Sequence, residues 1–590
     1  MASWAPGVTT PSQCNAPSYI GLCRILKIWR FDSLDRLSRI DYPDGTYLTA
    51  TYDAEGNTLT AAGFGFARSD VWDALNRVTS ITFNFGPVSK TVAYTYDEKS
   101  NRRTMTYPEG QVVTYTWDGL DRLATLSDSI LGSWTFGHDA GSRRTSLTNP
   151  SGLKTTYMYN KANWITKLET RTSGGLVVER FNYTHDHVGN RLTAVEENGN
   201  TTTYAYDNVY RLKSESYTGG LVINYTYDGV GNRLAEVRNA VTTSYTYDAD
   251  NRVTARGTTT YGYDDNGNTV ARTVPGQGTT TYAYDLENRL TKVTLANGTV
   301  TDFQYSVRGK RMSYAVNGAK TYLMYDFYDL SKLRVEDRIA DYTTSGTLLA
   351  RYIHGPGADE PLAVVQGSTY FYSANAIGTV TSLTTTSQTP VVNYEYEAFG
   401  QLRASAGIVS NPYRFAAREW DDSTVSYYFR ARWYETTLGR FFVADPWKFV
   451  DGPNFYVYVN NNPSNEVDPK GLNHRDCRIP CFNGGSGGDR TNCSACCYQA
   501  CLTAPGIRCA SDCMQFCITR ANLCQFLMDM YLQGRATRED LELQECFEPC
   551  YGFLPDIPDT GGGQPSPPLP KDDEKKEKRP PKTPGADPLP

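Results

Sequence analysis

The sequence predicts a mainly β protein whose hairpin repeats form a long antiparallel sheet that coils into a hollow shell. Tyrosine is the unusual residue of this 590-residue chain, with 43 copies against 22 Phe and 9 Trp, and glycine is frequent at 50 copies. This composition favours strands and turns over helices. In addition, an aromatic residue followed by Asp recurs about every 20 residues. A repeat of that length indicates an array of one supersecondary unit.

The repeat is an aromatic–acid pair at the end of each predicted outgoing strand. The pairs are Phe31-Asp32, Tyr52-Asp53, Trp72-Asp73, Tyr96-Asp97, Trp117-Asp118, His138-Asp139, His185-Asp186, Tyr206-Asp207, Tyr227-Asp228, Tyr247-Asp248, Tyr263-Asp264 and Tyr284-Asp285. A second tyrosine stands two positions earlier in many units, as Tyr225 does before Tyr227. Alternate residues of a strand leave the same face, so the tyrosines should stack as a ladder across neighbouring strands.

Each unit is predicted to be a hairpin. The Asp228 carboxylate can accept backbone N–H bonds and so start a turn. Gly231 and Asn232 then supply the positive φ that a tight reversal needs, and Arg233 opens the returning strand. Successive hairpins should pair side by side into one very long sheet.

A long open sheet must close or coil to protect its edges. Its faces read as Thr, Tyr, Asn and Arg, without a deep aliphatic core pattern. We therefore expect a coiled sheet with a roomy interior, and the alternative is a narrow solenoid fibre with a solid core.

Charge and hydropathy exclude several classes of protein. The net charge of −6 is mild and gives no argument for nucleic-acid or membrane-surface binding. No apolar run is long enough to span a membrane. The N-terminal apolar run is interrupted by Arg24 and Lys27, which makes a poor signal peptide. Repeat-like sequence begins by Phe31, so we expect the chain to be the tail of a longer protein, with residues 1–30 as a truncated N-terminal segment. No cofactor and no metal site are predicted.

Residues 414–472 form a different kind of segment, rich in Arg and Tyr and carrying two Asp-Pro pairs, at Asp445 and Asp468, 23 residues apart. Two carboxylates held close together cannot both ionise easily, so one can stay protonated while the other activates water. The following prolines restrict both aspartates, and Arg432 could orient a carboxylate or a carbonyl. The alternative interpretation is that both pairs are ordinary turns and Arg432 is a surface ion partner.

The Tyr-Asp…Gly-Asn-Arg units resemble the YD repeats of rearrangement-hot-spot (Rhs) proteins, toxin-complex C components and teneurins. Residues 350–363 (ARYIHGPGADEPLA), 395–400 (EYEAFG) and 414–472 resemble the Rhs repeat-associated core, so the resemblance covers about residues 30–472. Two positions depart from the family pattern: Ala398 replaces a usual Pro and Asn375 a frequent Asp.

The resemblance implies a spiral shell at 31–325 and a core at 326–472 that plugs one end of it. In bacterial toxin members this core is an intramolecular aspartic protease that cuts after DPxGL. Transferred to this sequence, the catalytic pair is Asp445 and Asp468, the supporting residue is Arg432, and the cleaved bond joins Leu472 to Asn473.

Downstream, residues 473–555 are predicted to be a small, helical, cysteine-rich domain, and residues 556–590 a disordered Pro/Lys/Glu-rich tail. The predicted cysteine-rich domain contains twelve cysteines, which are Cys477, Cys481, Cys493, Cys496, Cys497, Cys501, Cys509, Cys513, Cys517, Cys524, Cys546 and Cys550. An even number at this density favours disulfides in an oxidising compartment, whereas zinc is the competing interpretation. His474 is the only histidine after Leu472, which argues against a cargo whose catalysis depends on histidines.

Three functions compete. The first is a self-cleaving shell, secreted or at the cell surface, that encloses its own C-terminal toxin or effector and meets an immunity protein and delivery machinery. The second is a non-enzymatic adhesion protein with a teneurin-like shell. The third is an inert structural fibre. Intact Arg432, Asp445, Asp468 and Leu472 favour the first.

Overall fold

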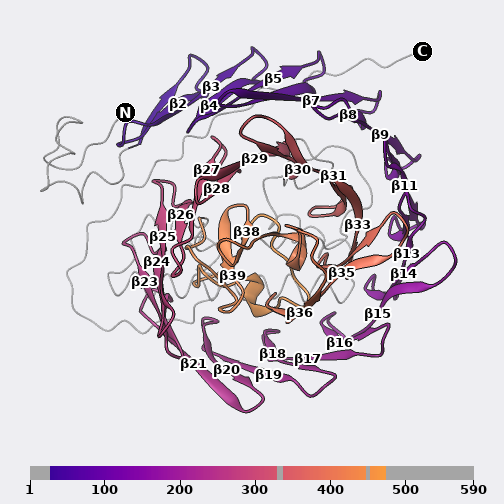
Figure 1. Cartoon of the computed structure of the whole chain (residues 1–590), viewed down its shortest axis with the longest axis vertical. Helices are drawn as coiled ribbons and strands as arrows, with labels where there is room; N and C mark the ends of the chain where they lie inside the picture. Colours follow the sequence, from indigo (N-terminus) through magenta and orange to yellow (C-terminus); the bar gives the residue numbers. More distant parts are fainter. Residues whose placement is uncertain (1–26, 328–335, 447–451, 473–590) are drawn as a thin grey trace, which may run out of the picture. The chain divides into compact units, whose positions relative to one another are not determined.

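A computed structural model of the chain describes residues 27–327, 336–446 and 452–472, which form β-strands and turns almost throughout (Figure 1). The predicted cysteine-rich domain, the tail, Asn473 and nearly all of the N-terminal segment lie outside the described residues. The disulfide and zinc interpretations of the twelve cysteines therefore stay predictions.

The main sheet has 36 strands, and each strand pairs antiparallel with the next one along the chain. The first eighteen are β1 (Ile28–Phe31), β2 (Leu37–Asp41), β3 (Tyr47–Tyr52), β4 (Thr58–Gly63), β5 (Phe66–Trp72), β6 (Val78–Phe85), β7 (Val88–Tyr96), β8 (Arg102–Thr106), β9 (Val112–Trp117), β10 (Leu123–Asp128), β11 (Gly132–His138), β12 (Arg144–Thr148), β13 (Lys154–Tyr159), β14 (Ile165–Arg171), β15 (Val177–His185), β16 (Arg191–Glu196), β17 (Thr201–Tyr206) and β18 (Leu212–Tyr217).

The other eighteen continue the same meander. They are β19 (Val222–Tyr227), β20 (Arg233–Arg238), β21 (Val241–Tyr247), β22 (Val253–Arg256), β23 (Thr259–Tyr263), β24 (Thr269–Val274), β25 (Gly278–Tyr284), β26 (Leu290–Thr294), β27 (Val300–Tyr305), β28 (Arg311–Val316), β29 (Ala319–Asp326), β30 (Asp337–Thr343), β31 (Leu348–His354), β32 (Pro361–Gln366), β33 (Ser368–Ala374), β34 (Val380–Thr385), β35 (Pro390–Tyr396) and β36 (Leu402–Ala406). The predicted long antiparallel sheet of hairpins is confirmed.

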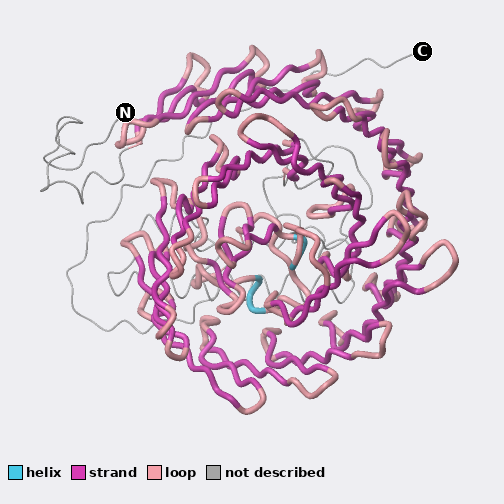
Figure 2. The backbone as a smooth tube through the Cα atoms, viewed as in Figure 1, coloured by secondary structure: helices cyan, strands magenta, loops and turns pink. Residues whose placement is uncertain are grey.

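A second, four-stranded sheet follows the large one. It contains β37 (Glu419–Asp421), β38 (Ser426–Phe429), β39 (Arg432–Glu435) and β40 (Arg440–Phe441). Short 3-10 turns, η2 (Phe415–Ala417) and η4 (Val459–Asn461), flank it and are the cyan pieces of Figure 2. We call residues 411–446 and 452–472 the closing segment.

The Asp of each repeat shapes the turn as predicted. One oxygen of Asp228 accepts the backbone N–H groups of Val230 (3.0 Å) and Asn232 (2.8 Å). Its other oxygen accepts the Asn232 side chain at 2.9 Å, and Gly231 takes a φ of 85°. In units that carry Arg at this position the guanidinium takes the same place, as Arg211 does on Asp207 at 2.6 Å. The repeat aspartates of this kind are therefore turn formers.

The tyrosines join each hairpin to the one before it. The hydroxyl of Tyr227 donates to the carbonyl of Leu212 at 2.9 Å, and Tyr206 and Tyr284 make the same bond to Arg191 (2.6 Å) and Thr269 (2.9 Å). The guanidinium of the preceding turn lies over the ring, as Arg211 does 5.0 Å from the centre of Tyr227. These contacts use the face that alternation predicts, and each of the three hydroxyl bonds joins residues 15 positions apart in neighbouring hairpins.

The sheet winds so that its later strands lie inside its earlier ones (Figure 1). Tyr94 of β7 donates to Asp326 of β29 at 2.9 Å, and Arg102 of β8 is 2.6 Å from the same carboxylate. Tyr107 donates to the carbonyl of Tyr352 at 2.6 Å, although the two residues are 245 positions apart. Such contacts between distant strands are the evidence for the predicted spiral.

The spiral has an outer and an inner winding. Where these two windings of the sheet overlap, the structure differs from the expected polar sheet without an aliphatic core. Strand β6 buries Ile81, Phe83 and Phe85, all at 1% exposure or less, against residues such as Leu323 and Ala363 of the inner turn. The pattern was missed because Thr and Ser occupy the outward alternate positions of the same strands. This part of the sheet packs face to face as sandwiches do.

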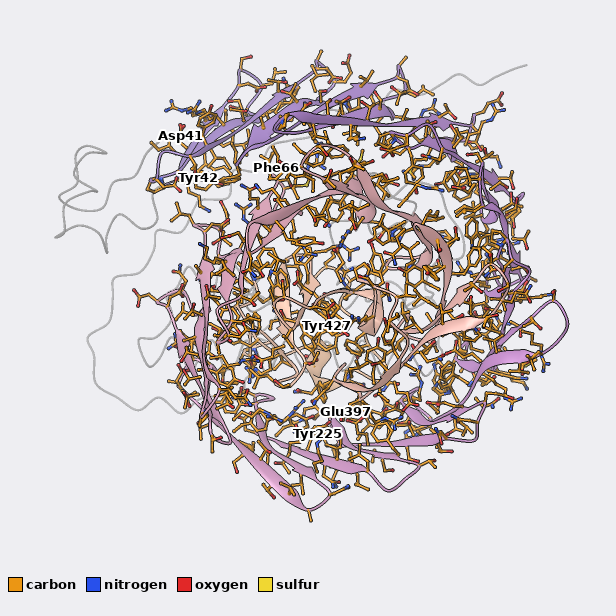
Figure 3. The ribbon with its side chains drawn as sticks, in the orientation of Figure 1. Asp41, Tyr42, Phe66, Tyr225, Glu397 and Tyr427 are labelled. Carbon is orange, nitrogen blue, oxygen red and sulfur yellow. The ribbon has the colours of Figure 1, made fainter. Side chains whose placement is uncertain are left out.

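Farther along, inward side chains of the outer strands contact the segment after β35 instead. Figure 3 places Tyr225 and Glu397 close together in this region. The ring of Tyr225 packs edge-on against Phe399 with centroids 5.3 Å apart, and Arg238 lies 2.6 Å from Glu397. The inner face therefore combines aromatic packing with buried ion pairs.

Candidate active site in the closing segment

The closing segment covers the turns that follow the repeat aspartates. Asn454 donates to the carbonyl of Val230 (3.1 Å), Asn461 to that of Gly231 (2.9 Å) and Tyr456 to that of Gly267 (2.9 Å). Because the strands alternate in direction, the turns that follow a repeat tyrosine lie at the same end of the strands. The closing segment therefore lies against the turns at one end of these strands.

Arg432, at the start of β39, brings the two aspartates of the Asp-Pro pairs together. Its Nη2 atom is 2.9 Å from Oδ2 of Asp445 and 3.4 Å from Oδ2 of Asp468. The guanidinium lies 3.6 Å from the ring centre of Phe441, and Arg432 is 1% exposed. The alternative of a surface ion partner is therefore wrong for Arg432.

Asp468 is at once a turn former and a member of this cluster. Its Oδ1 accepts the backbone N–H of Leu472 at 3.0 Å, and its carbonyl accepts that of Gly471 at 3.3 Å. This is the bonding pattern of the repeat turns. One oxygen thus faces Leu472 and the other faces Arg432, which fixes the carboxylate beside the residue that precedes the predicted cleavage bond.

The rest of the Arg432 guanidinium holds backbone. Its Nε donates to the carbonyl of Gly471, and Nη1 donates to the carbonyl of Phe455 at 3.0 Å. The N–H of Asp445 donates to that same Phe455 carbonyl at 2.9 Å. A single arginine therefore ties together both aspartates, the 452–458 region and the segment that ends at Leu472.

Burial intensifies the electrostatics of this cluster. Asp445 and Asp468 are 3% and 1% exposed, and they share a single guanidinium nitrogen. Both acids therefore lie on the same cation, away from solvent. Close by, burial raises the pKa of the Tyr458 hydroxyl well above its usual value, with further contributions from Tyr434 and Asp468, so this hydroxyl stays protonated.

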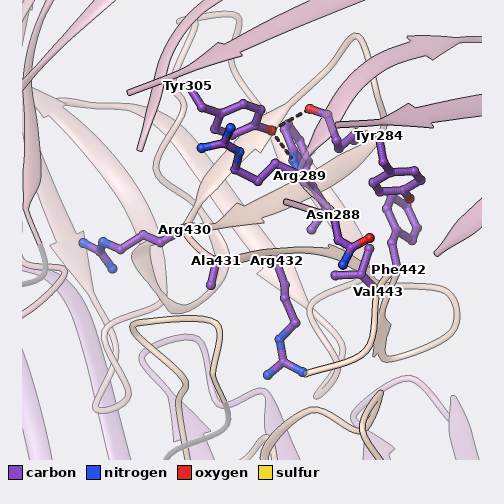
Figure 4. A pocket seen from close by; sticks show the side chains of 11 residues that line it. Tyr284, Asn288, Arg289, Tyr305, Arg430, Ala431, Arg432, Phe442 and Val443 are labelled. Carbon is purple, nitrogen blue, oxygen red and sulfur yellow. Dashed lines mark hydrogen bonds between the residues drawn. The ribbon is translucent and has the colours of Figure 1, made fainter. Parts of the chain in front are cut away.

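A small pocket adjoins the cluster, between the closing segment and the repeat turn at Asn288 (Figure 4). Arg430, Arg432, Trp433 and Phe442 line it from one side, and Asn288, Arg289 and Tyr305 from the other. The Tyr305 hydroxyl donates to the Leu290 carbonyl at 2.6 Å and accepts the Trp433 indole N–H at 3.3 Å. These bonds fix β39 against the sheet, and in Figure 4 Arg432 points away from Tyr305.

Sequence reasoning missed several residues of the cluster. Phe441 and Phe455 contribute a ring face and a carbonyl, and no motif announces either role. Arg430 was also missed, although it stands two positions before Arg432. Gly471 belongs to the predicted cleavage motif, and its φ of 67° and its contact with Phe429 now explain why glycine stands there.

Within the described ranges no three His, Cys, Asp or Glu side chains are grouped as metal ligands are. No helix in that part of the chain is long and apolar enough to cross a membrane.

Comparison with known proteins decides the family. Residues 145–464 match the sequence pattern of the family described as Teneurin YD-shell, and residues 72–112 match that described as RHS Repeat. The first match covers more than half of the chain. The chain belongs to the teneurin YD-shell family.

Two curated proteins are similar in sequence to this chain. The tRNA3(Ser)-specific nuclease WapA of Bacillus spizizenii is 29% identical over 414 residues, covering 64% of this chain and 16% of that protein. The double-stranded DNA deaminase toxin A of Burkholderia cenocepacia is 25% identical over 382 residues, covering 61% of this chain and 22% of that protein. The chain thus spans less than a quarter of the length of either relative.

The YD shell also matches a solved structure. The crystal structure of TcdB2-TccC3-TEV superimposes with a TM-score of 0.60 at 17% identity, covering 76% of this chain and 27% of that one. At this identity the likeness concerns the fold. It agrees with the spiral sheet of 36 strands.

Proposed function

We propose that this YD shell encloses its own C-terminal region and releases it by hydrolysing the bond between Leu472 and Asn473. The observation that carries the proposal is the meeting of Asp445 and Asp468 at Arg432, with Asp468 bonded to the N–H of Leu472. The cluster is buried, and the closing segment that carries it lies against the repeat turns at one end of the strands. Both features support a reaction that is confined to the chain itself.

The proposed reaction is aspartic hydrolysis. The ionised aspartate of the pair accepts a proton from a water molecule as the water oxygen attacks the Leu472 carbonyl carbon. The protonated aspartate gives its proton to the departing nitrogen of Asn473. The C–N bond breaks, leaving a carboxyl group on Leu472 and an amine on Asn473. Arg432 orients both acids and holds the Gly471 carbonyl, which limits the movement of the reacting bond.

The released part, residues 473–590, is proposed to be a toxin or effector. The names of the two relatives, a tRNA nuclease and a double-stranded DNA deaminase toxin, support this class of cargo. An immunity protein, delivery machinery and secretion belong to the same proposal. The twelve cysteines favour a cargo that is stabilised by disulfides in an oxidising compartment.

A second candidate function is adhesion without cleavage. A stretch of 86 residues is 36% identical to salivary gland surface protein 1 of Aedes aegypti, although it covers only 14% of this chain and 2% of that protein. In such a protein the aspartates would shape turns and stabilise the plug, and the cysteine-rich region would be a binding module.

The test is the intact mass of purified, denatured wild-type protein beside the variants Asp445→Asn and Asp468→Asn. We expect a fragment that begins at Asn473 in the wild type and a single full-length species in both variants. Asp207→Asn is the matched control, because Asp207 forms the same kind of turn but lies in the repeats; it should leave cleavage intact. Full-length protein alone in the wild type would reject self-cleavage and favour adhesion.

A further inference from the structure

A second arginine, Arg430, holds the segment that leads to Leu472. It lies in the two-residue turn between β38 and β39, with a φ of 59°, and its Nη1 donates to the carbonyl of Pro469. The N–H of Ala431 donates to the carbonyl of Lys470 at 3.2 Å, and Nε of Arg432 donates to that of Gly471. Three successive carbonyls before the predicted cleavage bond are therefore bonded by three successive residues.

Arg430 is oriented by an acid from a distant part of the chain. Its Nη2 is 2.7 Å from Oδ1 of Asp359 and its Nη1 is 3.2 Å from Oδ2, which is a two-pronged contact. A third contact reaches Asp337 at 3.4 Å. Asp359 lies between β31 and β32, and the guanidinium of Arg418 also donates to its Oδ1.

We propose that Asp359 and Arg430 are positioning residues for the self-cleavage described above, on which this inference rests. Asp359 fixes the guanidinium of Arg430, and Arg430 in turn fixes the Pro469 carbonyl. The carbonyls of residues 469–471 are then held on the side of Arg432, which fixes the position of Leu472, whose N–H donates to Asp468. Misplacement of a reacting group by about 1 Å costs roughly a hundredfold in rate. This assigns a role to the GPGADE stretch, whose Asp359 stands 86 residues before Asp445.

Asp359 has a neighbour that serves as a matched control. Glu360 also forms an ion pair with an arginine, Arg144 of β12, and its other oxygen accepts the N–H of Gly357 at 2.8 Å. The Arg144–Glu360 pair anchors the same loop to the outer strands but makes no contact with residues 469–472 in the described structure. Loss of Arg144 should weaken the fold without changing the cleavage segment.

The experiment follows cleavage over time in the full chain, made by cell-free synthesis that is stopped at a fixed moment. Arg430→Gln and Arg430→Lys should each slow the appearance of the Asn473 fragment at least tenfold, because lysine cannot bond the Pro469 carbonyl and both Asp359 oxygens together. Asp359→Asn should slow it less, since Asp337 still faces Arg430. Arg144→Gln should stay within twofold of the wild type.

Stability is measured separately by placing each substitution in the Asp468→Asn background and recording its melting temperature. Methylguanidine added to Arg430→Ala should restore part of the cleavage rate, an effect that a general loss of stability would not produce. Wild-type rates in Arg430→Gln, or an equal slowing in Arg144→Gln, would overturn the inference while self-cleavage stands. Absence of cleavage in the wild type would overturn the proposed function and this inference with it.

Discussion

The backbone N–H of Leu472 is bonded to the side chain of Asp468, 3.0 Å away. The same carboxylate faces Arg432 with its second oxygen. A turn of the kind that the repeats use throughout the sheet therefore also places an acid beside the predicted cleavage bond. Turn and active-site interpretations of Asp468 are compatible, because its two oxygens have different partners.

Gly471→Ala should block this arrangement. A Cβ atom at Gly471 would lie 2.0 Å from the Phe429 carbonyl oxygen, and the φ of 67° disfavours any L side chain. We expect loss of cleavage and a free energy of unfolding lower by about 3 kcal/mol, since overpacking adds to the backbone strain. Unfolding is followed in the Asp468→Asn background, and cleavage by intact mass in the wild-type background.

Gly175→Ala separates backbone strain from crowding. Gly175 has a φ of 87°, but nothing lies within 4 Å of the position that a Cβ atom would take there, so only the strain of about 1 kcal/mol remains. Normal cleavage in this variant together with none in Gly471→Ala is the expected outcome. Efficient cleavage in Gly471→Ala would contradict the role given to the 469–472 segment.

The sequence predicted the hairpin unit well because the unit is local. Asp228, Gly231 and Asn232 form their turn within five residues, and Tyr227 reaches only the preceding hairpin. The face-to-face packing of the outer and inner windings of the sheet was missed. Phe83 and Leu323 are distant in sequence, and no local pattern indicates which strands overlap. For the same reason Asp445, Asp468 and Arg432 were found through a family resemblance, whereas Asp359 and Arg430 required the structure.

The contact between the outer and inner windings of the sheet should be essential for stability. Asp326 is buried, pairs with Arg102 and accepts the Tyr94 hydroxyl. Asp326→Asn removes the charge that compensates a buried guanidinium, so we expect the free energy of unfolding to fall by about 3 kcal/mol. Urea unfolding in the Asp468→Asn background measures it.

An exposed ion pair provides the comparison for Asp326. Lys99 lies 3.0 Å from Asp121, and both side chains are about half exposed. Lys99→Gln should change stability by less than about 0.5 kcal/mol, because solvent screens the pair. Equal changes in stability in Lys99→Gln and Asp326→Asn would show that the two windings of the sheet are held together by something other than their buried contacts.

The stability of the shell should depend on pH through Glu179 of β15. Burial raises the pKa of this carboxyl from 4.5 to about 7, with Glu196 adding to the effect and Thr381 opposing it. The folded state therefore binds the proton more tightly than the unfolded state does. The resulting stabilisation is fully present below about pH 4.5 and is lost as the pH rises to about 7, a change of at most about 3 kcal/mol.

Glu179→Gln isolates this contribution, because glutamine is neutral at every pH. Other groups act in the opposite direction: burial lowers the pKa of His354 to about 4, which destabilises the fold as the pH falls below 6.5. The informative quantity is thus the difference in melting temperature between wild type and variant across pH 5 to 8. We expect the wild type to lose stability relative to the variant as the pH rises. A constant difference would mean that Glu179 is ionised in the folded shell throughout this range.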